Sequence, residues 1–124
     1  MAYRTSLARR TGSAHAGSRH WKLQRLTAVA LVPLGLWFVF AMVALSGEPY
    51  EQVRAFFASP FNATMTVLVV IAAFLHARLG IQVIVEDYVH APALKVTALV
   101  LNDLLSFAFA TSCIVAVLFA ALGS

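Results

Sequence analysis

Charged side chains are scarce in this chain: only 11% of its 124 residues are Asp, Glu, Lys or Arg, while 61% are hydrophobic. A soluble domain is typically about half apolar and about a quarter charged. A single short chain also has too little interior to bury so much apolar surface in a core of its own. These proportions exclude an ordinary soluble domain, and they predict an integral membrane protein whose apolar surface faces lipid.

Cysteine is almost absent as well. The one cysteine, Cys113, lies in an apolar run, so a disulfide within the chain is impossible, and we interpret this residue as a small buried hydrophobe. The sequence also lacks a nucleotide-binding loop, a cluster of metal ligands and a Ser–His–acid set in a recognisable context. We therefore predict that the chain catalyses no reaction alone.

The basic residues are unevenly distributed. Six of the nine precede the first apolar segment: Arg4, Arg9, Arg10, Arg19, Lys22 and Arg25. A basic segment beside a membrane helix usually marks the cytoplasmic side. Nucleic-acid binding is the competing interpretation of a basic segment, but this segment leads directly into a membrane span. We predict a cytoplasmic N-terminus, the lipid bilayer as a partner and no nucleic-acid partner.

Three apolar runs predict an all-α membrane protein with transmembrane helices over about 26–45, 62–85 and 93–122, each of roughly the ~20 residues or more that a bilayer requires. Residues 1–20 are polar and predict a flexible tail, which leaves 21–124 as the membrane domain. His15 and His20 fall in that tail, and His90 falls in the turn over 86–92. With three spans, this turn is cytoplasmic, while the 46–60 connection and the C-terminus are external. Phe56 and Phe57 suggest that the connection lies partly on the membrane surface.

Polar residues within the second span require an explanation, because a charge in a membrane helix costs at least ~2.5 kcal/mol. His76 lies well inside this span and can either bond a neighbouring helix or bind a metal or haem. Gly80 follows one turn later on the same face, so a second helix or a flat cofactor can approach closely. Asp87 follows His76 by eleven residues, almost three whole turns, which places it on that face ~16 Å nearer the cytoplasm, with Tyr88 beside it.

Arg78 and Asp103 form a second pair of costly residues. The turn between the second and third spans is centred near His90 and Ala91, and the two residues lie about equally far from that centre. In antiparallel neighbouring helices they should therefore lie at similar depth, and we expect them to approach each other directly or through water. The alternatives are that Arg78 reaches the surface or bonds another group, and that Asp103 is protonated or bonds another subunit.

At this point the sequence resembles a known family, the small hydrophobic membrane anchor subunit of succinate dehydrogenase, also called complex II. The family pattern is a histidine in the second helix, a glycine four residues later and an Asp-Tyr pair that closes the helix. Its parts occur here as His76-Ala77-Arg78-Leu79-Gly80 and Glu86-Asp87-Tyr88-Val89, together with Arg25-Leu26-Thr27-Ala28, Ser46-Gly47-Glu48 and Phe56-Phe57-Ala58-Ser59. The match covers roughly residues 20–95.

The resemblance implies a bundle formed with a second anchor subunit of the cytochrome b type around one haem b. In it, His76 takes the axial iron-ligand position, with its other ring N–H bonded to an acceptor, and Arg25 matches a basic residue near the haem propionates. Tyr88 matches the tyrosine that hydrogen-bonds a ubiquinone carbonyl, and Asp87 matches its acidic neighbour. An iron–sulfur subunit and a flavoprotein subunit complete the complex in the bacterial inner membrane. Succinate oxidation then takes place in the flavoprotein, and electrons pass to quinone at the membrane.

Three alternatives remain. An anchor of a fumarate reductase or of another quinone oxidoreductase shares the class, although a lone ligand histidine disfavours both haem-free and two-haem versions. A structural or assembly membrane protein without cofactor would explain the three helices but not the spacing of His76, Asp87 and Tyr88. Transport is disfavoured by the small number of spans and intramembrane charges.

Overall fold

The computed structural model describes residues 2–123, with side chains described from residue 17 onward. Over these residues the chain contains helices and no strand: α1 (Ala2–Leu45), α2 (Tyr50–Ala58), α3 (Pro60–Tyr88) and α4 (Pro92–Leu122). Three helical segments are long and apolar enough to cross a membrane, namely Gly17–Leu45 of α1 and the whole of α3 and α4. The predicted all-α class with three transmembrane helices is therefore confirmed.

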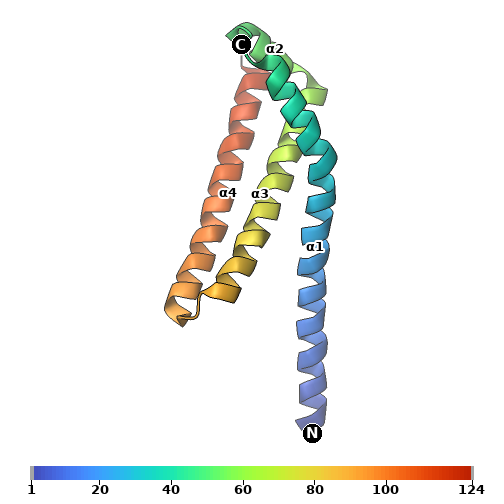
Figure 1. Ribbon diagram of the computed structural model, residues 1–124, viewed down its shortest axis with the longest axis vertical. Helices are drawn as coiled ribbons and strands as arrows, with labels where there is room; N and C mark the ends of the chain where they lie inside the picture. The colour runs from blue at the N-terminus through green and yellow to red at the C-terminus, as the bar shows by residue number, and fades with distance from the viewer. Residues whose placement is uncertain (1, 124) are drawn as a thin grey trace.

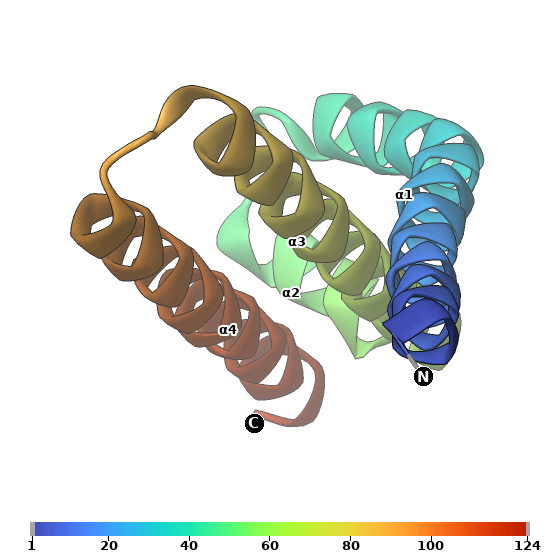
Figure 2. The ribbon, with the colours of Figure 1, turned by 90° about the horizontal axis from the view of Figure 1, so that it is seen from below.

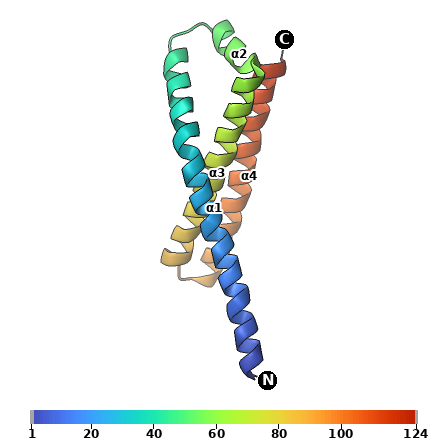
Figure 3. The same cartoon turned by 90° about the vertical axis from the view of Figure 1, so that its right-hand side faces the viewer.

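The long helices end where their apolar runs meet turn-forming residues. Gly47, with φ at 81°, follows the end of α1 in a left-handed conformation that only glycine adopts without strain. Pro60 and Pro92 stand in the first turns of α3 and α4, where the missing N–H of proline would have no helical partner anyway. Pro33 lies inside α1 without ending it. The second half of α1 bends as it approaches the connection to α2 (Figures 1 and 3).

The helix α3 is the central element, because it packs against both α1 and α4 (Figures 1 and 2). Consecutive long helices run in opposite directions. The N-terminus and the α3–α4 turn therefore lie at one end, while α2 and the C-terminus lie at the other (Figure 1). This alternation is the one that the sequence predicts from three spans.

The first helix is longer than the sequence predicts. Residues 2–20, which we expected to form a tail, have a helical backbone continuous with α1, which projects past the α3–α4 turn (Figure 3). The physical reason is that no proline interrupts this segment, and each of its glycines, Gly12 and Gly17, costs a helix only about 1 kcal/mol. His20 is therefore a helical residue, whereas the side chain of His15 lies outside the described residues.

The predicted polar connection contains α2, which sits across the end of the bundle opposite the α3–α4 turn (Figure 1). Phe56 stacks on Trp37 of α1 with ring centroids 5.9 Å apart, and its ring meets Phe57 edge-on at 5.2 Å. Asn62 of α3 donates a hydrogen bond from Nδ2 to the Phe56 carbonyl at 3.0 Å. These contacts tie α2 to the first and second spans.

The three spans bury little surface against one another. In the most apolar window of each, no more than 17% of the residues are buried within the chain. The buried apolar residues are few and mostly small or medium-sized: Ala41, Val69, Ala72, Leu79 and Val117. Lipid or other protein chains must therefore cover most of the apolar surface.

Candidate functional site

His76 faces α1 and makes a hydrogen bond to it. Its Nδ1 lies 3.1 Å from Oγ1 of Thr27, a residue that is only 5% exposed. The same Thr27 Oγ1 lies 2.8 Å from the Leu23 carbonyl oxygen and 3.1 Å from that of Gln24. Nδ1 of His76 thus has a hydrogen-bond partner in Thr27, and Nε2 has no hydrogen bond to any residue that the structure describes.

Gly80 lies one turn from His76 and faces Gln24 of α1. A Cβ built on Gly80 would lie 3.9 Å from Gln24 Nε2, an ordinary van der Waals separation, and would meet no other atom of the described side chains within 4 Å. The packing of α1 on α3 therefore does not require a glycine at this position.

Two further polar groups on α1 have no partner among the described residues. His20 Nε2 and Gln24 Oε1 are both buried and make no hydrogen bond there. With Thr27 they are spaced four and three residues apart, so that all three share the face of α1 that meets α3. The sequence analysis did not predict a role for His20, because it placed the beginning of the first helix near Leu26 and His20 in the preceding tail. The spacing of these three residues would have revealed the polar face if the helix had been extended to residue 17.

The Asp-Tyr pair stands at the end of α3, with both side chains exposed. Tyr88 is the last residue of the helix and is 78% exposed. Because α3 is continuous from Pro60 to Tyr88, His76 and Asp87 lie on one helical face as the spacing predicts. In the part of the chain with described side chains, neither Asp87 nor Tyr88 has a hydrogen-bond partner, and both are free to contact a ligand or another subunit.

Arg25 is not brought to His76 within this chain. It precedes Thr27 by two residues, which turns it about 200° around α1 from the side that meets His76. Its guanidinium carbon lies 5.1 Å from the centroid of the Trp21 ring, a cation–π arrangement. Its exposed charge faces away from the α1–α3 contact.

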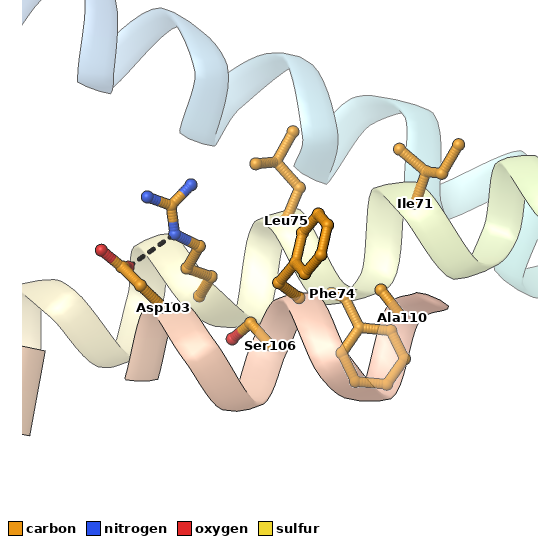
Figure 4. A pocket seen from close by; sticks show the side chains of 8 residues that line it. Ile71, Phe74, Leu75, Asp103, Ser106 and Ala110 are labelled. Atoms are coloured by element: carbon orange, nitrogen blue, oxygen red, sulfur yellow. Dashed lines mark hydrogen bonds and ion pairs between the residues drawn. The ribbon is translucent and has the colours of Figure 1, made fainter. Parts of the chain in front are cut away.

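Arg78 and Asp103, which we expected to approach each other directly or through water, form a direct ion pair. Arg78 Nε donates to Asp103 Oδ1 at 2.7 Å (Figure 4). Next to it, the buried Asn102 donates from Nδ2 to the Arg78 backbone carbonyl at 2.9 Å. These contacts join α3 to α4. Since Arg78 follows His76 by two residues, the ion pair lies on the opposite side of α3 from the contact with Thr27.

The ion pair closes one end of an open groove of ≈ 370 Å³ between α3 and α4 (Figure 4). Each helix contributes a stripe with helical spacing: Ile71, Phe74, Leu75 and Arg78 from α3, and Asp103, Ser106, Phe107 and Ala110 from α4. The residues with described side chains contain no group of three or more His, Cys, Asp or Glu that could hold a metal ion. The described side chains therefore form no three-ligand metal site at His76.

The family model and the individual relatives that match this chain agree with one another. The family described as succinate dehydrogenase/fumarate reductase transmembrane subunit matches residues 1–120. The succinate dehydrogenase hydrophobic membrane anchor subunit of Rickettsia bellii is 36% identical over 112 residues, which cover 90% of each chain. The protein of the same name from Paracoccus denitrificans is 36% identical over 77 residues, 62% of this chain and 60% of that one. A succinate dehydrogenase membrane anchor subunit from Reclinomonas americana is 33% identical over 89 residues, 69% of this chain and 74% of the relative.

Proposed function

Because the chain belongs to the family of succinate dehydrogenase/fumarate reductase transmembrane subunits, we propose that it is the small membrane anchor of a succinate dehydrogenase and helps to bind haem b and ubiquinone. The observation that carries this proposal is His76: it lies within a membrane span, Nδ1 is paired with Thr27, and Nε2 has no hydrogen bond to the described residues. A ligand histidine of a metal usually has this arrangement, with one ring nitrogen bonded by the protein and the other given to the metal.

The residues around His76 fit a haem. Gly80, one turn from His76, has no side chain that would obstruct a flat group there, and the α1–α3 packing does not require a glycine at this position. In this proposal His76 would hold the haem iron from this chain, and a residue of the second anchor subunit would hold it from the other. A bound haem b provides one-electron redox chemistry, with a potential that depends on the axial ligands and their hydrogen bonds.

Arg25 is proposed as a partner of the haem propionates, because a guanidinium pairs well with carboxylates. The support is its place in the family motif and its exposed charge. Its stacking on Trp21 leaves the N–H groups of the guanidinium available in the plane of the group.

Tyr88 and Asp87 are proposed as part of the ubiquinone site. Reduction of a quinone to a quinol adds two electrons and two protons. A phenol O–H can donate to the carbonyl oxygen as negative charge builds on it, and a carboxylate can orient water or relay protons to it. The exposure of both side chains at the end of α3 supports this role. One helix end cannot enclose a quinone ring, so partner subunits must form the other walls of the site.

The proposed assembly contains a second anchor subunit of the cytochrome b type, an iron–sulfur subunit and a flavoprotein subunit in the bacterial inner membrane. The chain is a multi-pass membrane protein whose spans leave most of their apolar surface uncovered, which supports a large partner surface. The basic residues near the start of the first span support a cytoplasmic N-terminus. Asp87 and Tyr88, at the same end, would then face the subunits that deliver electrons.

Purification of the tagged chain in mild detergent tests this function. We expect mass spectrometry to identify the three partner subunits in equal amounts, and the reduced-minus-oxidised spectrum to show a b-type haem. Succinate should reduce ubiquinone in the purified complex. A stable complex with other proteins but without haem would instead support the cofactor-free structural or assembly role.

A further inference from the structure

In the described part of the chain, the hydroxyl of Thr27 is the one group that forms a hydrogen bond with the His76 ring. The hydroxyl proton is donated to a different acceptor. A threonine hydroxyl carries one proton and two lone pairs. Of the three contacts of Oγ1, the shortest is to the Leu23 carbonyl oxygen at 2.8 Å, which can only accept. This bond to the carbonyl four residues earlier is common for threonine in a helix. The lone pairs of Oγ1 remain available for His76.

In the hydrogen bond between Thr27 and His76, the imidazole of His76 is therefore the donor and the hydroxyl oxygen of Thr27 is the acceptor. If Oγ1–H donates to Leu23, Oγ1 accepts at 3.1 Å from Nδ1–H of His76. A neutral imidazole with its proton on Nδ1 has an unprotonated Nε2, which is the nitrogen able to bind a metal. Because Thr27 is 5% exposed, water does not compete for this contact.

We propose that Thr27 is the positioning residue of His76: it fixes the ring as the Nδ1–H tautomer, orients Nε2 away from α1 and strengthens Nε2 as an iron ligand. The inference rests on the proposed function, because it supposes that His76 binds haem. A hydrogen bond from Nδ1–H to an acceptor increases the basicity of the other nitrogen and stabilises the oxidised metal. Thr27 thus tunes the haem without touching it.

Substitution of Thr27 in the complete complex tests this inference. Thr27→Val keeps the shape of the side chain but removes the acceptor. We expect ~10–100-fold lower haem affinity, the usual effect of losing a hydrogen-bond partner of a metal ligand. We also expect a higher midpoint potential and a shifted low-spin EPR signal, which reports the orientation of the axial rings.

Two variants serve as controls. Thr27→Ser retains the hydroxyl and should restore the wild-type potential and EPR signal. Thr97→Val removes a threonine of α4 that makes the same kind of bond, to the Ala93 carbonyl at 2.8 Å, but has no histidine bonded to it among the described residues. This variant should behave as wild type. If Thr27→Val does not assemble, Thr27→Ala removes the same acceptor with less steric change.

A wild-type potential, EPR signal and haem affinity in Thr27→Val or Thr27→Ala would overturn the inference, as would a Thr27→Ser variant that changes as much as Thr27→Val. The failure of the proposed function has a different signature. If His76→Leu leaves the haem spectrum unchanged, the ligand assignment itself is wrong. If His76→Leu loses the haem while Thr27→Val behaves as wild type, only the role of Thr27 is wrong.

Discussion

A single hydroxyl distinguishes tyrosine from phenylalanine, and at Tyr88 that hydroxyl is the group on which the proposed quinone site depends. The side chain is 78% exposed at the end of α3, so the hydroxyl does not hold the helix in place. Removing it should therefore leave the fold intact. Any effect of the change reports what the hydroxyl does for a ligand or a partner.

We predict that Tyr88→Phe lowers ubiquinone reduction by the assembled complex about 10–100-fold, because a hydrogen bond to a charged group contributes ~1.5–3 kcal/mol. Succinate oxidation with an artificial dye should stay near the wild-type rate. Tyr50→Phe is a matched control, since Tyr50 is 77% exposed and lies at the opposite end of the bundle. If Tyr88→Phe and Tyr50→Phe both reduce ubiquinone at the wild-type rate, Tyr88 is an ordinary interfacial tyrosine.

At the residue scale, sequence reasoning identified His76 but not its partner. The sequence of one helix is enough to show that a histidine lies inside an apolar run. The contact with Thr27 depends on how α1 slides and rotates against α3, and the sequence contains no short turn between these two helices that fixes their register. His20 and Gln24 were missed for a related reason, because their burial appears only when α1 extends beyond the apolar run.

At the scale of helices, a short turn makes register predictable. Only Val89, His90 and Ala91 separate α3 from α4, so residues equally far from the turn lie at equal depth in the antiparallel pair. Arg78 and Asp103 satisfy this condition and form the ion pair at 2.7 Å. Their side chains are 40% and 53% exposed, so the pair is only partly covered by this chain.

The ion pair should stabilise the contact between α3 and α4 by a modest amount. Asp103→Leu leaves Arg78 unpaired within a membrane span, and Arg78→Leu leaves Asp103 unpaired, so we predict that each lowers the melting temperature of the detergent-solubilised complex. The double variant should recover part of the loss. The coupling energy from the double-mutant cycle should be about 0.6 kcal/mol and not above ~1.7 kcal/mol, the average and the maximum found for interhelical bonds in a membrane protein.

The haem spectrum is the control measurement for this cycle. Arg78 and His76 lie on opposite sides of α3, so the three variants should retain the b-type spectrum. Strictly additive losses in the single and double variants would show that the two side chains do not stabilise each other.

The sequence analysis did not predict the helix α2 within the connection over 46–60. The polar composition of this segment indicated that it lies outside the bilayer. Gly47 and Pro49 are typical of turns and loops, so they did not suggest the nine-residue helix that follows them. That helix depends on tertiary contacts, including the stacking of Phe56 on Trp37 and the hydrogen bond from Asn62. An isolated helix of this length is unstable in water, so its formation could not be read from local sequence alone.

At the scale of the whole molecule, the chain resembles part of a larger bundle. Its three spans form an open layer with α3 in the centre, and few of their side chains are buried within the chain (Figure 2). The number of spans and the membrane class followed from composition and length. The partner surface could not be located from the sequence, because lipid-facing and partner-facing helix surfaces are equally apolar.

The decisive measurement is the haem spectrum of a His76→Leu variant in the purified complex, with His90→Leu as the matched control, since His90 is exposed in the α3–α4 turn. We predict that His76→Leu abolishes or shifts the b-type spectrum and its midpoint potential, while His90→Leu retains both. Dye-coupled succinate oxidation should persist in both variants, because the proposed function assigns that reaction to a flavoprotein subunit and not to this chain. A His76→Leu complex with the wild-type spectrum and potential would contradict the assignment of His76 as an iron ligand.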